Sequence, residues 1–198
     1  MVTAALVTFN REREIRKVEA HLRASGLFAD VIVWRNKPSD NRMVYGRYLA
    51  AAQARTELIY TQDDDCLVDN LEELVDAFDG KHLVSALKPN VADVYKKKFG
   101  RAQVTLVGWG AVFRRDWLSV FDRYIEHYGV DDLLLREADR IFTLLLNRPH
   151  HSLPAKIREF PSAVSERALS HQRNHWSYFY AAVERAAAIK ASVRSVPS

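Results

Sequence analysis

The sequence is poor in cysteine, and this narrows the kinds of site that it can contain. Its 198 residues include one cysteine, Cys66, which excludes an internal disulfide framework and a zinc site with several cysteine ligands. We therefore expect a protein of a reducing compartment, the cytoplasm. No apolar run approaches the roughly 20 residues that span a bilayer. The first residues also lack the charged start and the cleavage site of a signal peptide.

The composition has no extreme of charge or polarity. Hydrophobic residues make up 48% and charged residues 27%, with a formal net charge of +4, which is typical of globular chains and argues against disorder. A mildly basic surface is compatible with an anionic ligand, a nucleic acid or a membrane surface, and it selects none of them. The position of particular residues therefore has to indicate the function.

Strands and helices alternate in the first third of the chain. Short apolar runs predict strands at residues 4–9, 31–34 and 58–61, with helices at 10–25 and 41–54 between them. We expect Asn10 to cap the first helix. This order predicts a parallel sheet with right-handed crossovers, whose ligands lie outside the carboxyl ends of the strands. The segments at the ends of all three strands carry polar groups: Phe9-Asn10-Arg11, Arg35-Asn36-Lys37 and Asp63-Asp64-Asp65.

The rest of the chain is less regular. We expect helices at residues 69–78, 117–127 and 132–147, strands at 82–87 and 103–113, a loop at 149–165 and a long helix within 165–193. Gly108 and Gly110 interrupt the second of these strands, at a bulge or a close approach of a ligand. Lys96-Lys97-Lys98 with Arg101 is the densest basic run, either solvated surface or a contact to nucleic-acid phosphates.

The three consecutive aspartates are the clearest chemical signal. Adjacent carboxylates raise each other's pKa or require a cation. Asp63 and Asp65 could offer oxygens to a hard divalent ion such as Mg²⁺ or Mn²⁺, which keeps positions open for phosphate oxygens. The alternative is a solvated turn, and we expect Asp64 to face solvent or to contact a donor.

Four segments resemble motifs of the GT-A-fold glycosyltransferases and occur in the order of that family. They are the opening strand with Thr8-Phe9-Asn10, the stretch from Arg47 through Glu57 to Asp65, the segment Gly108-Trp109-Gly110 before Arg114-Arg115, and Glu137-Ala138-Asp139. The sequence departs from the family at three positions: Thr56 stands where Gly is usual, Tyr48 where Asn is frequent, and Ala138 separates the late acidic residues.

The resemblance implies an α/β fold: a GT-A-like, Rossmann-type, mostly parallel sheet flanked by helices, with a C-terminal helical extension. The catalytic domain would cover residues 1–165, with a donor-binding half at about 1–90 and an acceptor-side half at about 91–165, and residues 166–198 would form the C-terminal helix and tail. The implied reaction moves a sugar from a nucleotide-diphosphate sugar, in most cases a UDP-sugar, to a hydroxyl of a carbohydrate, a protein or a modified DNA base.

The resemblance also implies roles for individual residues. Asp65 would hold Mn²⁺ or Mg²⁺, joined by His175 or His171. Asp63 would be a second ligand of the metal, or would contact the ribose of the donor or a metal-bound water. Asp139, beside Glu137, would act as the base for an acceptor hydroxyl in an inverting reaction, or would position the acceptor in a retaining one. The remaining expected donor contacts are Thr8, Phe9, Asn10, Arg11, Asn36, Arg47, Asp64, Gly108, Trp109 and Gly110.

Other functions fit parts of the same pattern. A nucleotide-sugar or nucleic-acid binding module could keep this fold without catalysis. A nucleotidyltransferase would need a glycine-rich loop after the first strand, and the sequence has no glycine there. Single residues also have structural alternatives: an exposed position at a helix start for Arg11, an i,i+4 or surface charge for Arg47, core packing for Trp109, and helix-start stabilisation for Asp139.

Overall fold

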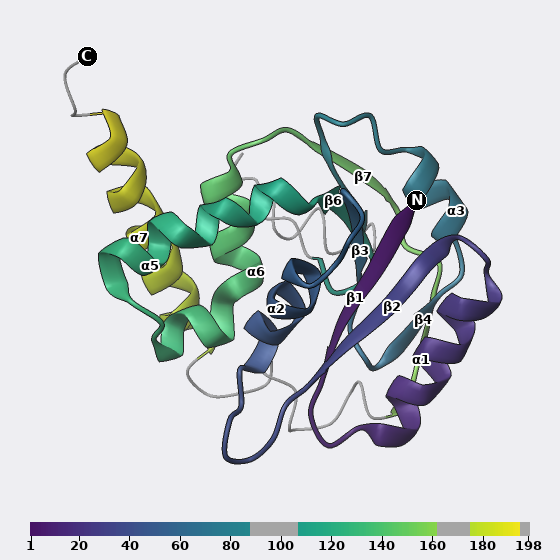
Figure 1. Ribbon diagram of the computed structural model, residues 1–198. Coiled ribbons are helices and arrows are strands. Elements are labelled where there is room, and N and C mark those ends of the chain that lie inside the picture. The colour runs from purple at the N-terminus through teal and green to yellow at the C-terminus, as the bar shows by residue number, and fades with distance from the viewer. Residues whose placement is uncertain (88–106, 162–174, 195–198) are drawn as a thin grey trace.

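The computed structural model describes residues 1–87, 107–161 and 175–194 (Figure 1). Its elements in chain order are β1 (Val2–Thr8), α1 (Glu12–Ala24), β2 (Phe28–Arg35), η1 (Met43–Tyr45), α2 (Gly46–Ala52), β3 (Leu58–Thr61), β4 (Cys66–Val68), α3 (Leu71–Asp76), β5 (Leu83–Leu87), β6 (Ala111–Arg114), η2 (Arg115–Ser119), α5 (Val120–Tyr128), α6 (Asp132–Leu146), β7 (His150–Pro154), β8 (Ile157–Glu159) and α7 (His175–Arg194).

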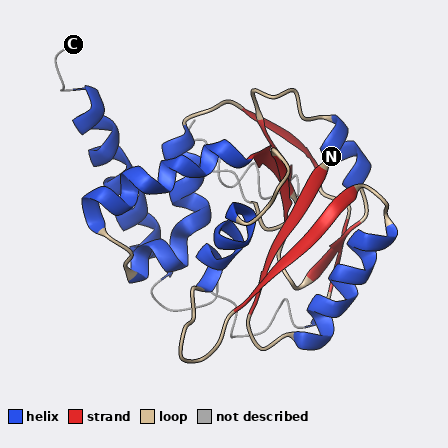
Figure 2. Cartoon of the chain, viewed as in Figure 1, coloured by secondary structure: helices blue, strands red, loops and turns tan. Residues whose placement is uncertain are grey.

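A six-stranded sheet organises the molecule, with the strand order β2-β1-β3-β6-β5-β7. Strand β1 pairs in parallel with β2 and with β3, and β5 pairs in parallel with β7. Strand β6 runs antiparallel to both of its neighbours, β3 and β5. The expected mostly parallel α/β sheet is therefore confirmed, and helices flank it on both sides (Figure 2).

Side chains of alternate residues in the central strands enter two separate cores, as the twofold period of a strand requires. Ala5 and Ile59 belong to the core that includes residues of α2, α5, α6 and α7. Ala4 and Tyr60 belong to the core that includes residues of α1 and α3. The helices gather accordingly into two groups on opposite faces of the sheet (Figure 1).

The first helix follows its apolar period but begins differently from our expectation. Ile15, Val18 and Leu22 are buried, as the sequence pattern predicts. Asn10 does not cap the helix, because its φ of 59° turns the chain after β1 and the N-cap position falls on Arg11, without a side-chain cap bond. The expectation of an asparagine cap was wrong, and this turn instead directs Arg11 toward the acidic segment.

Further corrections concern short strands. The expected loop at 149–165 contains β7 and β8, which pair with β5 and β4 through backbone bonds that the proline-rich sequence does not suggest. The strand expected at 103–113 begins only at Ala111 within the described residues, so that Gly108 and Gly110 precede β6; residues 103–106 lie outside the described part. Strand β4 directly follows the aspartates and was not expected.

Helix α6 is interrupted at a residue of interest. Glu137 has φ −111° and ψ 22°, so the helix consists of two segments, and Asp139 lies in the first turn of the second one. Helix α7 packs on α6 and places Ala186 and Ile189 in the same core as α2. Among the helices of the described ranges, none combines the length and the hydropathy needed to cross a membrane.

Candidate functional site

The aspartates leave the carboxyl end of β3 and are bound by the residues that follow β1. Asp64 is only 9% exposed, and its carboxylate accepts hydrogen bonds from Thr8 Oγ1 at 2.6 Å and from Arg11 Nη1 at 2.8 Å. Arg11 Nη1 also donates to Asp65 Oδ2 at 2.9 Å. Burial raises the pKa of Asp64 despite these partners. Asp64 therefore does not face solvent, and it fixes the turn on which Asp63 and Asp65 lie.

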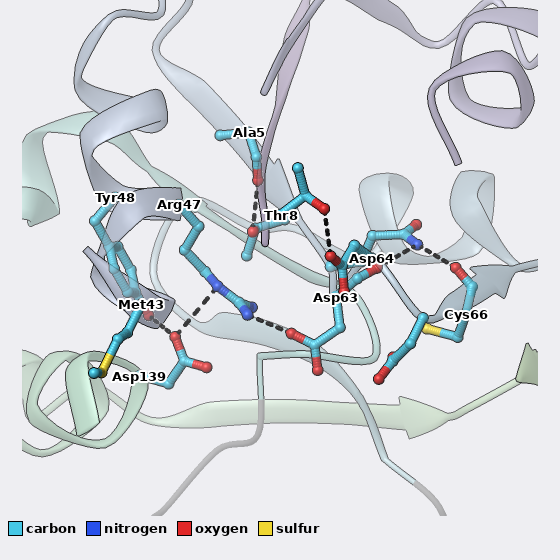
Figure 3. A network of polar contacts seen from close by, with 12 residues as sticks. Ala5, Thr8, Met43, Arg47, Tyr48, Asp63, Asp64, Cys66 and Asp139 are labelled. Carbon is cyan, nitrogen blue, oxygen red and sulfur yellow. Dashed lines mark hydrogen bonds and ion pairs between the residues drawn. The ribbon is translucent and has the colours of Figure 1, made fainter. Parts of the chain in front are cut away.

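A buried arginine links the aspartates to helix α6. The Arg47 side chain is 2% exposed, its Nη2 donates to Asp63 Oδ1, and its Nε lies 3.6 Å from Asp139 Oδ1 (Figure 3). Nε and Nη1 of Arg47 are buried without a hydrogen-bond partner. Burial alone would lower the pKa of Arg47, but the charges of Asp139 and Asp63 outweigh it and the pKa is raised. The guanidinium thus stays charged between two carboxylates.

Asp63 lies directly against a glycine. The backbone N–H of Asp63 donates to the carbonyl of Gly108 at 2.7 Å. A Cβ added at Gly108 would lie 2.1 Å from Oδ2 of Asp63, far closer than atoms can approach. Gly110 has a φ of 103°, and a Cβ there would lie 3.0 Å from the Leu74 side chain. Both expected glycines therefore shape this end of the sheet, and Gly108 contacts the acidic segment itself.

The carboxylates of Asp63 and Asp65 suit a divalent cation. Each of them has one oxygen that no described residue hydrogen-bonds, because Arg47 and Arg11 occupy the other. Burial and the charge of Asp63 raise the pKa of Asp65 to about 6, and a cation would relieve both effects. No three His, Cys, Asp or Glu side chains converge on a metal position within the described ranges. Two carboxylates are the usual protein share of a Mg²⁺ site completed by substrate phosphates.

Asp139 reaches the same region from α6. Its side chain is 26% exposed, and its Oδ1 accepts a hydrogen bond from Tyr48 Oη at 2.8 Å. Burial raises the pKa of Asp139, while the charge of Arg47 opposes that rise. Glu137, expected beside Asp139, is buried and accepts a hydrogen bond from Arg140 Nε at 2.8 Å. The two late acidic residues thus have different surroundings, and Asp139 is the one that accepts a hydrogen bond from Tyr48 of α2.

Other expected site residues lie in more ordinary surroundings. Phe9 is 38% exposed at the end of β1. The Asn36 side chain closes its own loop, since Nδ2 donates to the Met43 carbonyl at 3.1 Å and Oδ1 accepts from the Arg42 N–H at 2.8 Å. Trp109 is partly buried against the core that contains α1.

Some expectations fall where the structure does not test them. His171 lies outside the described residues, as do Lys96, Lys97, Lys98 and Arg101. His175 begins helix α7, and its side chain is outside the described part as well. The histidine ligand therefore remains a prediction.

Two polar residues of the site were missed. Gln62 is fully buried, accepts a hydrogen bond from Tyr60 Oη at 2.9 Å and donates from Nε2 to the Cys66 carbonyl at 2.7 Å, so it braces the turn that carries the aspartates. Tyr48 was noted only as a departure from a family pattern. The available signal was a polar group in a segment predicted to be buried, because such a group needs a partner.

Comparisons with known proteins identify the fold. No family model and no curated protein matches the sequence. The solved structure of TarS from S. aureus in complex with UDP is similar over 95% of this chain and 64% of that chain, with 14% identity and a TM-score of 0.57. Glucosyl-3-phosphoglycerate synthase from Mycobacterium tuberculosis, in complex with Mn²⁺, UDP and phosphoglyceric acid, is similar over 100% and 80%, with 11% identity and a TM-score of 0.51.

A third structure shows how much of a longer enzyme the chain matches. The catalytic domain of Drosophila β1,4-galactosyltransferase 7 has 15% identity over 61% of this chain, and the chain spans only 51% of it, with a TM-score of 0.43. At these identities the likeness concerns the path of the backbone and not the activity. The strand order, the flanking helices and the structures of TarS and the mycobacterial synthase agree that the chain has the GT-A fold of nucleotide-sugar glycosyltransferases.

Proposed function

We propose that the protein transfers a sugar from a nucleotide-diphosphate sugar, most plainly a UDP-sugar, to an acceptor hydroxyl. The observation that carries this proposal is the acidic segment after β3, where Asp63 and Asp65 each have one oxygen that no residue of the described ranges hydrogen-bonds, at the carboxyl edge of a GT-A sheet. TarS and the mycobacterial synthase were solved with UDP, the latter together with Mn²⁺. The acceptor that we favour is a carbohydrate.

The residues of this chain divide the work at the donor. Asp63 and Asp65 would hold Mn²⁺ or Mg²⁺, and the diphosphate oxygens would fill its remaining positions. When bound, the metal stabilises the negative charge that the departing diphosphate develops. Arg11 keeps Asp64 and Asp65 in one arrangement, and Arg47 does the same for Asp63. The two arginines orient the carboxylates and offset part of their mutual repulsion.

Asp139 is the base in this proposal. Its Oδ2 is not hydrogen-bonded by any described residue, and the partly exposed side chain can approach an acceptor hydroxyl. A base must come within about 3 Å of the oxygen whose proton it takes. Its link to Asp63 through Arg47 keeps it beside the donor site. The proposed reaction therefore inverts the anomeric centre, with the acceptor proton passing to Asp139.

Calorimetric titration of UDP with and without Mn²⁺ tests the proposal, followed by an assay of UDP release from a panel of UDP-sugars. We expect Mn²⁺ to tighten UDP binding. In Asp65→Asn the affinity for UDP in the presence of Mn²⁺ should be at least about tenfold weaker than in wild type, since metal sites are sensitive to small changes around them. Asp76→Asn, at an exposed position, is the matched control. Equal binding by both variants would refute the metal site. Metal-dependent binding without turnover would instead support a binding module.

A further inference from the structure

Tyr48 lies beside Arg47 at the start of α2 and is 2% exposed. Its ring packs among three phenylalanines: the centroids of Phe113, Phe121 and Phe142 lie 6.2, 4.7 and 5.1 Å from it. These rings come from β6, α5 and α6, so the aromatic body of Tyr48 is fixed from several sides. A rigid ring gives its hydroxyl a defined position.

Within the part of the chain that the structure describes, the hydroxyl of Tyr48 makes a single hydrogen bond. It donates a hydrogen bond of 2.8 Å to Oδ1 of Asp139, a residue 91 positions later in the sequence (Figure 3). Arg47 Nε approaches the same oxygen, at 3.6 Å. Arg47 and Tyr48, which are neighbours on α2, therefore both lie near Oδ1 of Asp139. No described residue hydrogen-bonds its Oδ2. If this side chain only filled the core, a phenylalanine would serve, because a buried hydroxyl costs free energy unless it is hydrogen-bonded.

We propose that Tyr48 is a positioning residue for Asp139, whose hydroxyl holds Oδ1 so that Oδ2 remains for the proton of the acceptor. The inference rests on the proposed role of Asp139 as the base. Tyr48 touches neither the donor nor the acceptor in this account. It fixes the orientation of the carboxylate and, by donating to it, favours the ionised form that a base requires.

The charged surroundings of Asp139 define what removing this hydroxyl does. Arg47 and Tyr48 face it from α2, Asp63 from the segment after β3, and Glu137 from α6 itself. Arg47 and Tyr48 stabilise the carboxylate, whereas Asp63 and Glu137 disfavour it. Tyr48→Phe removes one of the two stabilising groups and keeps the ring, so the pKa of Asp139 must rise.

The experiment has a readout that does not depend on turnover. The carboxyl carbon of Asp139 is titrated by ¹³C NMR in protein labelled at aspartate, with its resonance identified by Asp139→Asn. We expect Tyr48→Phe to raise the pKa of Asp139 by roughly one pH unit, the worth of one hydrogen bond to a charged group. Tyr45→Phe is the matched control, since Tyr45 is a buried tyrosine of the same core with no hydrogen bond to Asp139.

The pH dependence of UDP release then connects the contact with the reaction. In Tyr48→Phe the acidic limb moves to higher pH by the same amount, the KM for the UDP-sugar stays unchanged, and adding the change to Asp139→Asn has no further effect. Thermal unfolding confirms that each variant is folded at the assay temperature. Identical Asp139 titrations in wild type, Tyr48→Phe and Tyr45→Phe would overturn the inference. If the Asp139 titration shifts in Tyr48→Phe but the wild-type protein releases no UDP, the proposed function is refuted and the contact between Tyr48 and Asp139 stands.

Discussion

Replacing Gly108 by alanine separates the site from the fold. The added Cβ would lie 2.1 Å from Oδ2 and 2.7 Å from Cγ of Asp63, whereas ordinary contacts between such atoms need roughly 3.4 Å or more. The carboxylate therefore has to move by more than about 1 Å, because its Oδ2 must retreat from 2.1 Å to the ordinary contact distance. The Asp63 side chain is 38% exposed, so it can move toward solvent, and the buried Arg47 keeps the carboxylate of Asp139 as its second charged neighbour.

The expected result is a loss of metal binding without a loss of stability. Metal ligands tolerate displacements of only about 0.2 Å, and disturbed surroundings cost about 10–100-fold in affinity. We expect calorimetry to show this weakening of Mn²⁺ binding in the presence of UDP, with a melting temperature within about 2 °C of wild type, since the change in stability is under about 1 kcal/mol.

Gly26→Ala should give the opposite pattern and serves as the control. No atom lies within 4 Å of a Cβ there, but its φ is 70°, and an alanine in that region costs about 1–2 kcal/mol. The melting temperature should fall by several degrees, about 2–4 °C per kcal/mol, with Mn²⁺ affinity unchanged. Unaltered Mn²⁺ binding in Gly108→Ala would refute the contact between Gly108 and the metal-binding carboxylate.

Two further predictions concern stability. Phe179→Leu removes the ring whose centroid lies 3.8 Å from the Arg140 guanidinium, and urea unfolding should show that the free energy of unfolding falls by about 2 kcal/mol. Phe9→Leu, at an exposed position, should change this free energy little. Equal losses in the two variants would contradict the cation–π contact. Burial lowers the pKa of His150 to about 4, so the unfolded chain takes up its proton first as the pH falls. Stability should therefore decline between pH 6.5 and 4, by up to about 3 kcal/mol. His150→Gln should abolish that part of the decline; identical pH profiles would contradict it.

The sequence predicted the parts of the fold that short-range patterns determine. Apolar runs located β1 and β3, and the spacing of Ile15, Val18 and Leu22 located the buried face of α1. The rule that strand ends share one edge of a parallel sheet also brought Arg11 to the aspartates, 53 and 54 positions away. These inferences succeeded because each depends on the apolar pattern of a short segment or on the order of the strands and helices along the chain.

The remaining features depend on tertiary contacts. Strand β7 includes Pro154 and forms at the edge of the sheet, where one side needs no partner, so composition alone suggested a loop. The partners of Asp64 come from β1 and the turn after it, and the pair of Tyr48 with Asp139 joins residues far apart in sequence. The sequence shows that Asp64, Tyr48 and Asp139 each carry a polar group, but it does not indicate which residue bonds to it.

A crystal structure with Mn²⁺ and UDP, with the anomalous signal of manganese recorded, tests the central claim most directly. We predict an anomalous peak at coordination distance from a carboxylate oxygen of Asp65, with Asp63 beside it and the diphosphate oxygens completing the shell. Ordered UDP with no manganese at these carboxylates, and with Asp63 and Asp65 bound only to Arg47 and Arg11, would contradict it.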